Sequence, residues 1–299
     1  MLRRARLTAY DYALYAMVVL AWGFAWIGIH FQVGVVAPDV SVLWRFLVAG
    51  PVLLAIAALR GDRLRFALRD HAMFALLGLL LFSLNFLLYY HAAEVLPSGL
   101  LSIAFSLASF FNVWLGALFL GTPIDRRVVA GGILGAAGMA ALFYPQFAGH
   151  AFPRGALIAL GLSLAGTLAF CFGNIVSALL SERKIPVFPA TGYGMLYGTA
   201  GLALYAFVNG HAFTVEWTLP YLVGLAYLAL IGSVLGFACY LTLLGRIGAD
   251  RAAYVTVLGP LVALAVSTVV ENFQWTIVAA CGLAAVLVGN VLVLRPRDR

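Results

Sequence analysis

The sequence predicts an all-α integral membrane protein with ten transmembrane helices, and three observations lead to this prediction. Of the 299 residues, 64% are hydrophobic and only 10% are charged, whereas a soluble protein carries about 25% charged residues. The mean hydropathy is +1.04. At roughly 30 residues for one helix and its loop, the length accommodates about ten spans and leaves no stretch for a separate soluble domain.

Apolar windows mark the predicted helices, and turn-forming residues separate them. Pro38 and Asp39 precede the second window, and Asn209 and Gly210 follow the seventh. The first window is kept as a helix and not as a cleaved signal peptide, because Asp11 interrupts it and no small-residue cleavage site follows. In chain order the windows are residues 11–30, 41–59, 71–91, 97–120, 126–144, 154–180, 188–208, 219–243, 250–270 and 274–294.

Lys and Arg are concentrated in alternate loops, and cytoplasmic loops carry the excess of basic residues. Arg154 falls on the outer side of this layout, and Arg45 lies in the outer part of the second helix. Both termini are therefore predicted to be cytoplasmic, and the charge of +7 does not call for a nucleic-acid partner. The other 16 of the 18 basic residues lie in the N-terminus, in 60–70, 121–127, 181–187 and 244–251, and in the C-terminus.

The two halves of the chain resemble each other at a nearly constant offset. Residues 20–27 align with 168–175, and residues 85–89 align with 236–240, at offsets of 148 and 151. Because each half holds an odd number of helices, the two halves must have opposite orientations. We therefore expect residues 1–150 and 151–299 to form two inverted five-helix repeats around a central cavity, an arrangement typical of alternating-access transporters.

Three short motifs resemble the drug/metabolite transporter superfamily and its EamA-type repeat. Residues 22–26, Trp-Gly-Phe-Ala-Trp, resemble the W-G-x-x-[FW] pattern of the first helix, and Arg45-Phe46 resembles the R-[FY] position of the second. Val270-Glu271 resembles the family's G-E step with the Gly replaced, whereas the first half has Gly121-Thr122 there. The resemblance covers essentially the whole chain and implies a multi-pass transporter of the bacterial inner membrane. The aromatic-rich first and third helices resemble most the aromatic amino-acid exporters of this family.

Polar and aromatic side chains inside the spans are the candidate substrate contacts, because such groups usually face a bundle interior or a cavity. Ser and Thr also bond to their own helix or mediate packing, and this alternative stays open for the serines. Aromatic rings offer faces on which a solute can stack. The predicted substrate-binding residues are Trp22, Trp26, Asn85, Tyr89, Ser106, Ser109, Phe170, Asn174 and Tyr240.

Charged groups are nearly absent from the spans. No Asp, Glu or Lys lies in the central two turns of any window, whereas phosphorylated solutes call for basic partners and proton-coupled carriers generally hold an ionisable relay. His30, His91 and Arg45 are the candidates for a proton or carboxylate partner. The alternatives are that the histidines are simply solvated and that Arg45 is structural. Facilitated diffusion and proton antiport both stay open.

An uncharged pocket of rings, hydroxyls and amides suits a neutral or zwitterionic solute with an apolar side chain. We therefore predict a broad exporter of neutral and aromatic amino acids that acts by alternating access, with drugs or other metabolites as the alternative. An enzyme is not expected, because the motifs H-E-x-x-H, G-x-S-x-G and G-x-x-x-x-G-K-[ST] are absent. No cofactor, metal or disulfide is expected, and the chain is expected to work as a monomer in the lipid bilayer.

Overall fold

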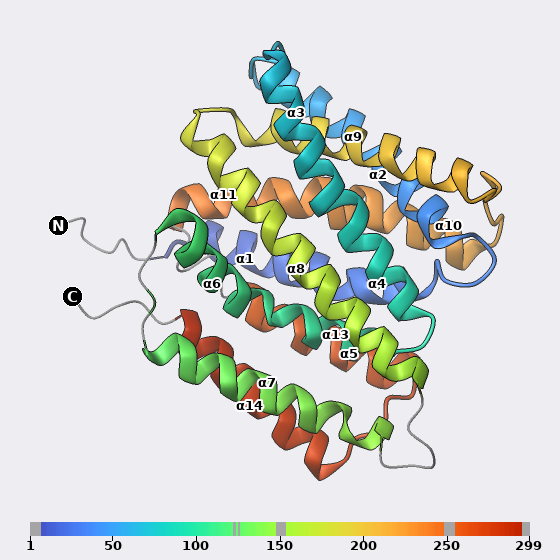
Figure 1. Ribbon diagram of the computed structural model, residues 1–299, viewed down its shortest axis with the longest axis vertical. Coiled ribbons are helices and arrows are strands. Elements are labelled where there is room, and N and C mark those ends of the chain that lie inside the picture. The colour runs from blue at the N-terminus through green and yellow to red at the C-terminus, as the bar shows by residue number, and fades with distance from the viewer. Residues whose placement is uncertain (1–6, 122–123, 125, 148–153, 248–254, 295–299) are drawn as a thin grey trace.

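The computed structural model describes residues 7–121, 124, 126–147, 154–247 and 255–294, and within these residues it consists of helices without strands (Figure 1). The helices are α1 (Ala9–His30), α2 (Pro38–Leu59), α3 (Leu68–Leu77), η1 (Gly78–Leu84), α4 (Asn85–Ala93), α5 (Ser98–Ser106), α6 (Ala108–Leu120), α7 (Arg126–Phe147), α8 (Arg154–Glu182), α9 (Val187–Val208), α10 (Leu219–Ala226), η2 (Tyr227–Leu235), α11 (Gly236–Ile247), α13 (Val255–Val270) and α14 (Ile277–Leu294).

Among the described residues, seven helical stretches are long and apolar enough to cross a membrane. They alternate with short connections along most of the chain, so the protein has the composition of a multi-pass membrane protein. Val257–Val270 and Ile277–Val293 are shorter apolar helices. The seven stretches are Ala9–His30, Pro38–Leu59, Leu68–Ala93, Ser98–Phe119, Arg126–Tyr144, Arg154–Glu182 and Leu219–Tyr240.

Local hydrogen bonds explain where several helices begin. At the start of α1, Thr8 Oγ1 accepts the Asp11 N–H at 3.3 Å and Asp11 Oδ2 accepts the Thr8 N–H at 2.8 Å, which is a capping box. Pro38 opens α2 three residues before the expected start, because proline lacks only an N–H that the first turn leaves unused. The last helix begins at Ile277 and not at the expected residue 274, since Thr276 Oγ1 accepts the Ala279 N–H at 3.0 Å.

Three predicted helices are less regular than expected. The window 97–120 is divided at Leu107 into α5 and α6. The windows 71–91 and 219–243 contain the π-helices η1 and η2, which begin at residues 78 and 227 and end at residues 84 and 235. They are therefore offset by 149 and 151 residues, close to the offset between the two halves of the sequence. π-Helices are rare and occur frequently at functional sites.

Helix packing joins the two halves of the chain. α7 lies along α14, and α2 lies along α9 (Figure 1). α1 packs against α11 and α13, while α8 packs against α4 and α6. In the same way η2 packs on α2 and η1 packs on α9. The contacts of α1 in the first half thus correspond to those of α8 in the second half, and the contact of η2 with α2 corresponds to that of η1 with α9.

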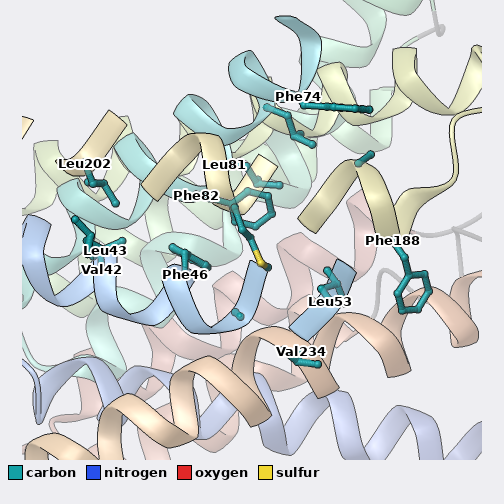
Figure 2. Packing of buried hydrophobic residues seen from close by; sticks show 14 of the residues in the cluster. Val42, Leu43, Phe46, Leu53, Phe74, Leu81, Phe82, Phe188, Leu202 and Val234 are labelled. Carbon is teal, nitrogen blue, oxygen red and sulfur yellow. The ribbon is translucent and has the colours of Figure 1, made fainter. Parts of the chain in front are cut away.

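The largest buried apolar cluster lies between α2, α3, η1 and α9 (Figure 2). Phe46, Phe74 and Phe82 are completely buried there. The helices approach closely because a glycine faces a glycine: a Cβ on Gly78 would lie only 2.2 Å from the carbonyl oxygen of Gly194. Small residues of this kind let helix backbones touch inside a membrane.

Candidate functional site

Four aromatic side chains from α1, α4, α5 and α8 contact one another, and we call them the Trp26 cluster: Trp26, Tyr89, Phe105 and Phe170. The Trp26 ring lies 5.1 Å from Tyr89 and 5.6 Å from Phe105, and Phe105 lies 4.7 Å from Phe170. Tyr89 is buried, whereas the other three are half-buried. The structure thus brings the predicted residues Trp26, Tyr89 and Phe170 together around Phe105.

Hydrogen bonding fixes the buried member of this cluster. The hydroxyl groups of Tyr89 and Thr167 lie 2.6 Å apart, and Thr167 Oγ1 also donates to the Ser163 carbonyl at 2.8 Å. Gly166 lets the Tyr89 ring approach, since a Cβ there would lie 3.0 Å from Tyr89 Cδ2. Tyr89 therefore supports the half-buried rings, which keep faces on which an apolar or aromatic solute can stack.

A second group, the Trp22 cluster, consists of Trp22, Phe237 and Tyr240. The Trp22 ring lies 5.7 Å from Phe237 and 5.1 Å from Tyr240, so this cluster joins α1 to α11. All three side chains are half-buried. The predicted residues Trp22 and Tyr240 thus lie together, in a different cluster from Trp26.

Trp22 and Asn85 satisfy backbone carbonyls at the ends of the two π-helices. The Asn85 N–H donates to Leu80 O, five residues back, and the Asn85 side-chain Nδ2 donates to Leu81 O at 3.3 Å. In the second half the Gly236 N–H donates to Ile231 O, again five residues back. The carbonyl of Gly232, which an α-helix would pair with Gly236, instead accepts the Trp22 indole N–H at 3.1 Å.

These two bonds occupy equivalent places, since Asn85 and Gly236 are offset by the same 151 residues as the sequence repeat. In the first half, the side chain of Asn85 at the end of η1 supplies the donor. In the second half, the indole of Trp22 on α1 supplies it. Gly236 makes room for this indole, because a Cβ at that position would lie 2.6 Å from Trp22 Nε1. Both predicted residues therefore hold the π-helical backbone in place.

The predicted serines bond to backbone and to α14. Ser106 Oγ donates to Ile103 O at 2.7 Å, and Ser109 Oγ donates to Ser106 O at 3.1 Å. Ser109 is also hydrogen-bonded to Asn290 Oδ1. These contacts match the packing alternative for hydroxyl groups in membrane helices.

Asn174 pairs with a second amide. Its Nδ2 donates to Asn112 Oδ1 at 3.1 Å, which links α8 to α6. Both side chains are half-buried. Asn174 also lies one turn of α8 after Phe170, a member of the Trp26 cluster.

The two candidate histidines belong to separate ion pairs. His30 Nδ1 lies 3.1 Å from Glu271 Oε1, and Glu271 also accepts the Ser98 N–H at 3.0 Å and the Ser98 hydroxyl at 2.5 Å. Glu271 thus connects the end of α13 to α1 and to the start of α5. His91 Nδ1 lies 3.5 Å from Glu94, three residues further along the chain.

Arg45 is buried between α2, α4 and η2. Its Nε donates to Ser233 Oγ at 3.1 Å, and its Cζ lies 4.3 Å from the centre of the Phe86 ring and 5.0 Å from that of Phe46. Such cation–π contacts attract a guanidinium without neutralising it. Through its bond to Ser233, Arg45 contacts η2, the π-helix in which the Gly232 carbonyl accepts the Trp22 indole N–H.

Two residues of the clusters are absent from the predicted set. Phe105 lies three residues after Ser102 and four before Ser109, so the helical spacing of that face carried the signal. Phe237 lies in the aligned segment 236–240, opposite Phe86 of the segment 85–89, so the repeat carried its signal. In the described part of the chain no group of three or more His, Cys, Asp or Glu side chains can hold a metal ion.

Comparison with known proteins relates the chain to membrane transporters. The EamA-like transporter family matches residues 11–144 and again residues 155–295. The uncharacterized inner membrane transporter YedA of Escherichia coli K12 is 28% identical, with 92% of this chain and 89% of that protein covered. The uncharacterized transporter YvbV of Bacillus subtilis is 26% identical, with 94% and 90% covered.

Two further matches extend over nearly the whole chain. A protein of E. coli K12 named as a probable amino-acid metabolite efflux pump is 25% identical, with 96% of each chain covered. A solved crystal structure superposes with a TM-score of 0.68 at 17% identity and covers 96% of both chains. The structural match shows that the two chains share a fold.

Proposed function

This chain belongs to the EamA-like transporter family, and from that premise we propose that it exports neutral and aromatic amino acids with broad specificity. Membership makes it a multi-pass membrane transporter and not an enzyme. The observation that carries the substrate proposal is the Trp26 cluster, whose half-buried rings offer apolar faces. The relative named as a probable amino-acid metabolite efflux pump supports the same class of solute.

Neighbouring uncharged groups complete the proposed site. An amino acid would stack its side chain on Trp26, Phe105 or Phe170, as aromatic rings do in offset or edge-to-face geometry. The amides of Asn174 and Asn85 would bond the ammonium and carboxylate groups. An exporter of drugs or other metabolites is the second candidate, because broad apolar faces do not select amino acids by themselves.

We propose alternating access by two inverted repeats, residues 1–150 and 151–299, with both termini in the cytoplasm. The exchanged helix contacts support this arrangement: α1 packs on α11 and α13 as α8 packs on α4 and α6. The equivalent π-helices support it further. Residues 1–6 and 295–299, which include the ends of the chain, lie outside the described residues.

We place the protein in the inner membrane of a bacterium, where it would work as a monomer. The name of YedA, an inner membrane transporter, supports this location. Two energy sources are compatible with the proposal, the concentration gradient of the solute and a proton gradient, and experiment decides between them. His30 would carry the proton in an antiporter, since it faces the buried carboxylate of Glu271, whereas a facilitator would need no such group.

Flux of radiolabelled phenylalanine into liposomes that hold the purified protein tests the proposal. We expect flux that other neutral amino acids inhibit, measured with and without an imposed pH gradient. Flux without the gradient identifies a facilitator, and flux only with the gradient identifies a proton-coupled carrier. Absence of flux in both conditions contradicts the amino-acid assignment and favours the drug or metabolite alternative.

Replacing one ring tests the site itself. We expect Trp26→Ala to lower phenylalanine flux about fivefold, because an aromatic pair contributes about 1 kcal/mol beyond its buried area. Trp217→Ala is the matched control, since Trp217 is 83% exposed. Equal flux in the two variants, at equal amounts of membrane protein, would exclude Trp26 from the site.

A further inference from the structure

Two buried nitrogen atoms near the start of α2 have no hydrogen-bond acceptor among the residues that the structure describes. One is Nη1 of Arg45, whose side chain is buried, and the other is Nε2 of Gln32, which follows α1. Leaving a buried donor without an acceptor costs about 1–3 kcal/mol, and more when the group is charged. Two such donors together indicate a missing acceptor.

The charge of Arg45 is also uncompensated within the described part of the chain. Arg45 forms an ion pair with none of the described carboxylates. Its neighbours are the Ser233 hydroxyl, the Tyr90 hydroxyl and the rings of Phe46 and Phe86. Buried charges in proteins are normally paired, because removing an ion from water is expensive. A negative group is therefore what this environment lacks.

The two orphan donors share a neighbour. Tyr90 donates its hydroxyl hydrogen to Gln32 Oε1 at 2.6 Å, and the same hydroxyl lies beside the Arg45 guanidinium. In this arrangement the amide oxygen of Gln32 is occupied by Tyr90 and its nitrogen is free. Gln32 thus offers a donor, and not an acceptor, next to the cation.

Gly232 of η2 lies beside the guanidinium. A Cβ added to Gly232 would meet nothing closer than Ala25 Cβ at 3.7 Å and Arg45 Nη2 at 3.8 Å. These are ordinary van der Waals distances, so the site accepts a methyl group without displacement.

We propose that Arg45 and Gln32 form a buried binding site for one monovalent anionic group. Arg45 supplies the charge and Nη1, Gln32 supplies the neutral donor Nε2, and Gly232 borders the guanidinium. Two sources fit this chemistry: the carboxylate of a transported amino acid and a free halide ion. The carboxylate source rests on the proposed function, whereas the halide source is independent of it.

Thermal unfolding of the purified full chain distinguishes the two sources. If the anion is a halide, sodium chloride and sodium bromide raise the Tm in a saturable manner relative to sodium methanesulfonate at equal ionic strength. If it is the solute's carboxylate, phenylalanine and 3-phenylpropionate raise the Tm, and phenylalaninamide, which lacks the carboxylate, does not. No saturable increase with any of these compounds overturns the proposal.

Two variants probe the site without removing the arginine. Gln32→Glu places a carboxylate from the protein beside Arg45, so we expect it to keep the fold and to lose the dependence on added anion. Gly232→Ala places a methyl group 3.8 Å from Arg45 Nη2, and we expect anion affinity to fall about tenfold, the effect of losing one hydrogen bond to a charged group. Gly161→Ala is the matched control, because a Cβ there meets nothing within 4 Å.

The outcomes separate this site from the proposed function. Halide stabilisation that Gln32→Glu abolishes, in a protein without phenylalanine flux, supports the site and contradicts amino-acid export. Phenylalanine flux with unchanged KM in both variants, without any anion effect on the Tm, supports export and overturns the site. An anion effect of equal size in Gly232→Ala and Gly161→Ala also overturns it.

Discussion

At the scale of single residues, Asn85 illustrates how a polar side chain in an apolar helix serves the backbone. Its side chain is 2% exposed, and its Nδ2 supplies the donor that the π-helix withholds from Leu81 O. Its Oδ1 has no donor among the described residues. The nitrogen of this amide therefore binds the backbone of η1, and its oxygen is left as a free acceptor. Under the proposed function, the ammonium group of a solute would be its donor.

Replacing this amide separates the two tasks. We expect Asn85→Leu to lower the free energy of unfolding by about 1–3 kcal/mol, because Leu81 O is left buried without a donor. The measurement is the midpoint of thermal unfolding in detergent. Asn209→Leu is the control, since Asn209 Nδ2 makes the same bond to the carbonyl four residues back, at 2.8 Å, but in an exposed position. Equal losses in the two variants would contradict the backbone role of Asn85.

Residue types were easier to predict than their partners. Trp22, Trp26, Tyr89 and Phe170 are predictable as candidates, because rings inside spans are informative on their own. The contact of Trp22 with a carbonyl 210 positions away along the chain is not predictable, since no local pattern encodes it. Gln32 was missed for the same reason, because only its buried contact with Tyr90 distinguishes it.

At the scale of elements, the two π-helices are the least predictable feature and the most regular one. Their residues are as apolar as those of neighbouring helices, so hydropathy windows cannot distinguish them. Each contains a buried serine: Ser83 Oγ donates to Gly198 O at 2.7 Å, and Ser233 Oγ donates to Leu228 O at 2.9 Å. Ser233 Oγ in turn accepts the Nε–H of Arg45.

A methyl group at Gly236 should break the contact between η2 and α1. In Gly236→Ala the new Cβ would lie 2.6 Å from Trp22 Nε1 and would displace the indole from Gly232 O. We expect phenylalanine flux to fall at least about tenfold, because a hydrogen bond and a ring contact are lost together. Gly161→Ala provides the comparison, and undiminished flux in Gly236→Ala would exclude a role for this contact.

At the scale of the whole molecule, ion pairs connect helices of opposite halves on the side predicted to be cytoplasmic. Arg246 Nε on α11 lies 2.5 Å from Asp11 Oδ1 on α1, and Nη2 of Arg183, the residue after α8, lies 2.7 Å from Asp70 Oδ1 on α3. The Asp11 carboxylate raises the pKa of Arg246 above its usual range. Both pairs therefore join a helix of the first half to the end of a helix of the second half.

Alternating access requires such contacts to separate during the cycle. We expect a bifunctional thiol reagent to stop phenylalanine flux in a variant with Asp11→Cys and Arg246→Cys, prepared after Cys171, Cys239 and Cys281 are replaced by Ala. A reductant that cleaves the link should restore the flux. Each single cysteine variant serves as the control. Unchanged flux in the linked protein would mean that α1 and α11 stay together throughout transport.

The general organisation of the molecule was more accessible from sequence than its packing. Composition and hydropathy predicted a multi-pass membrane protein, and short motifs such as Arg45-Phe46 indicated the family that the comparison then confirmed. The division at Leu107 and the π-helices depend on contacts between helices, which one sequence does not display. The ninth predicted helix extends into residues 250–254, which lie outside the described part of the chain.

Counterflow of phenylalanine tests the central claim most directly, because it requires both recognition of the amino acid and reorientation of a loaded carrier. Liposomes with the purified protein are filled with unlabelled phenylalanine and diluted into a trace of the labelled compound. The account predicts that label accumulates transiently inside above its outside concentration. Label that never exceeds the level in protein-free liposomes would contradict amino-acid transport by alternating access.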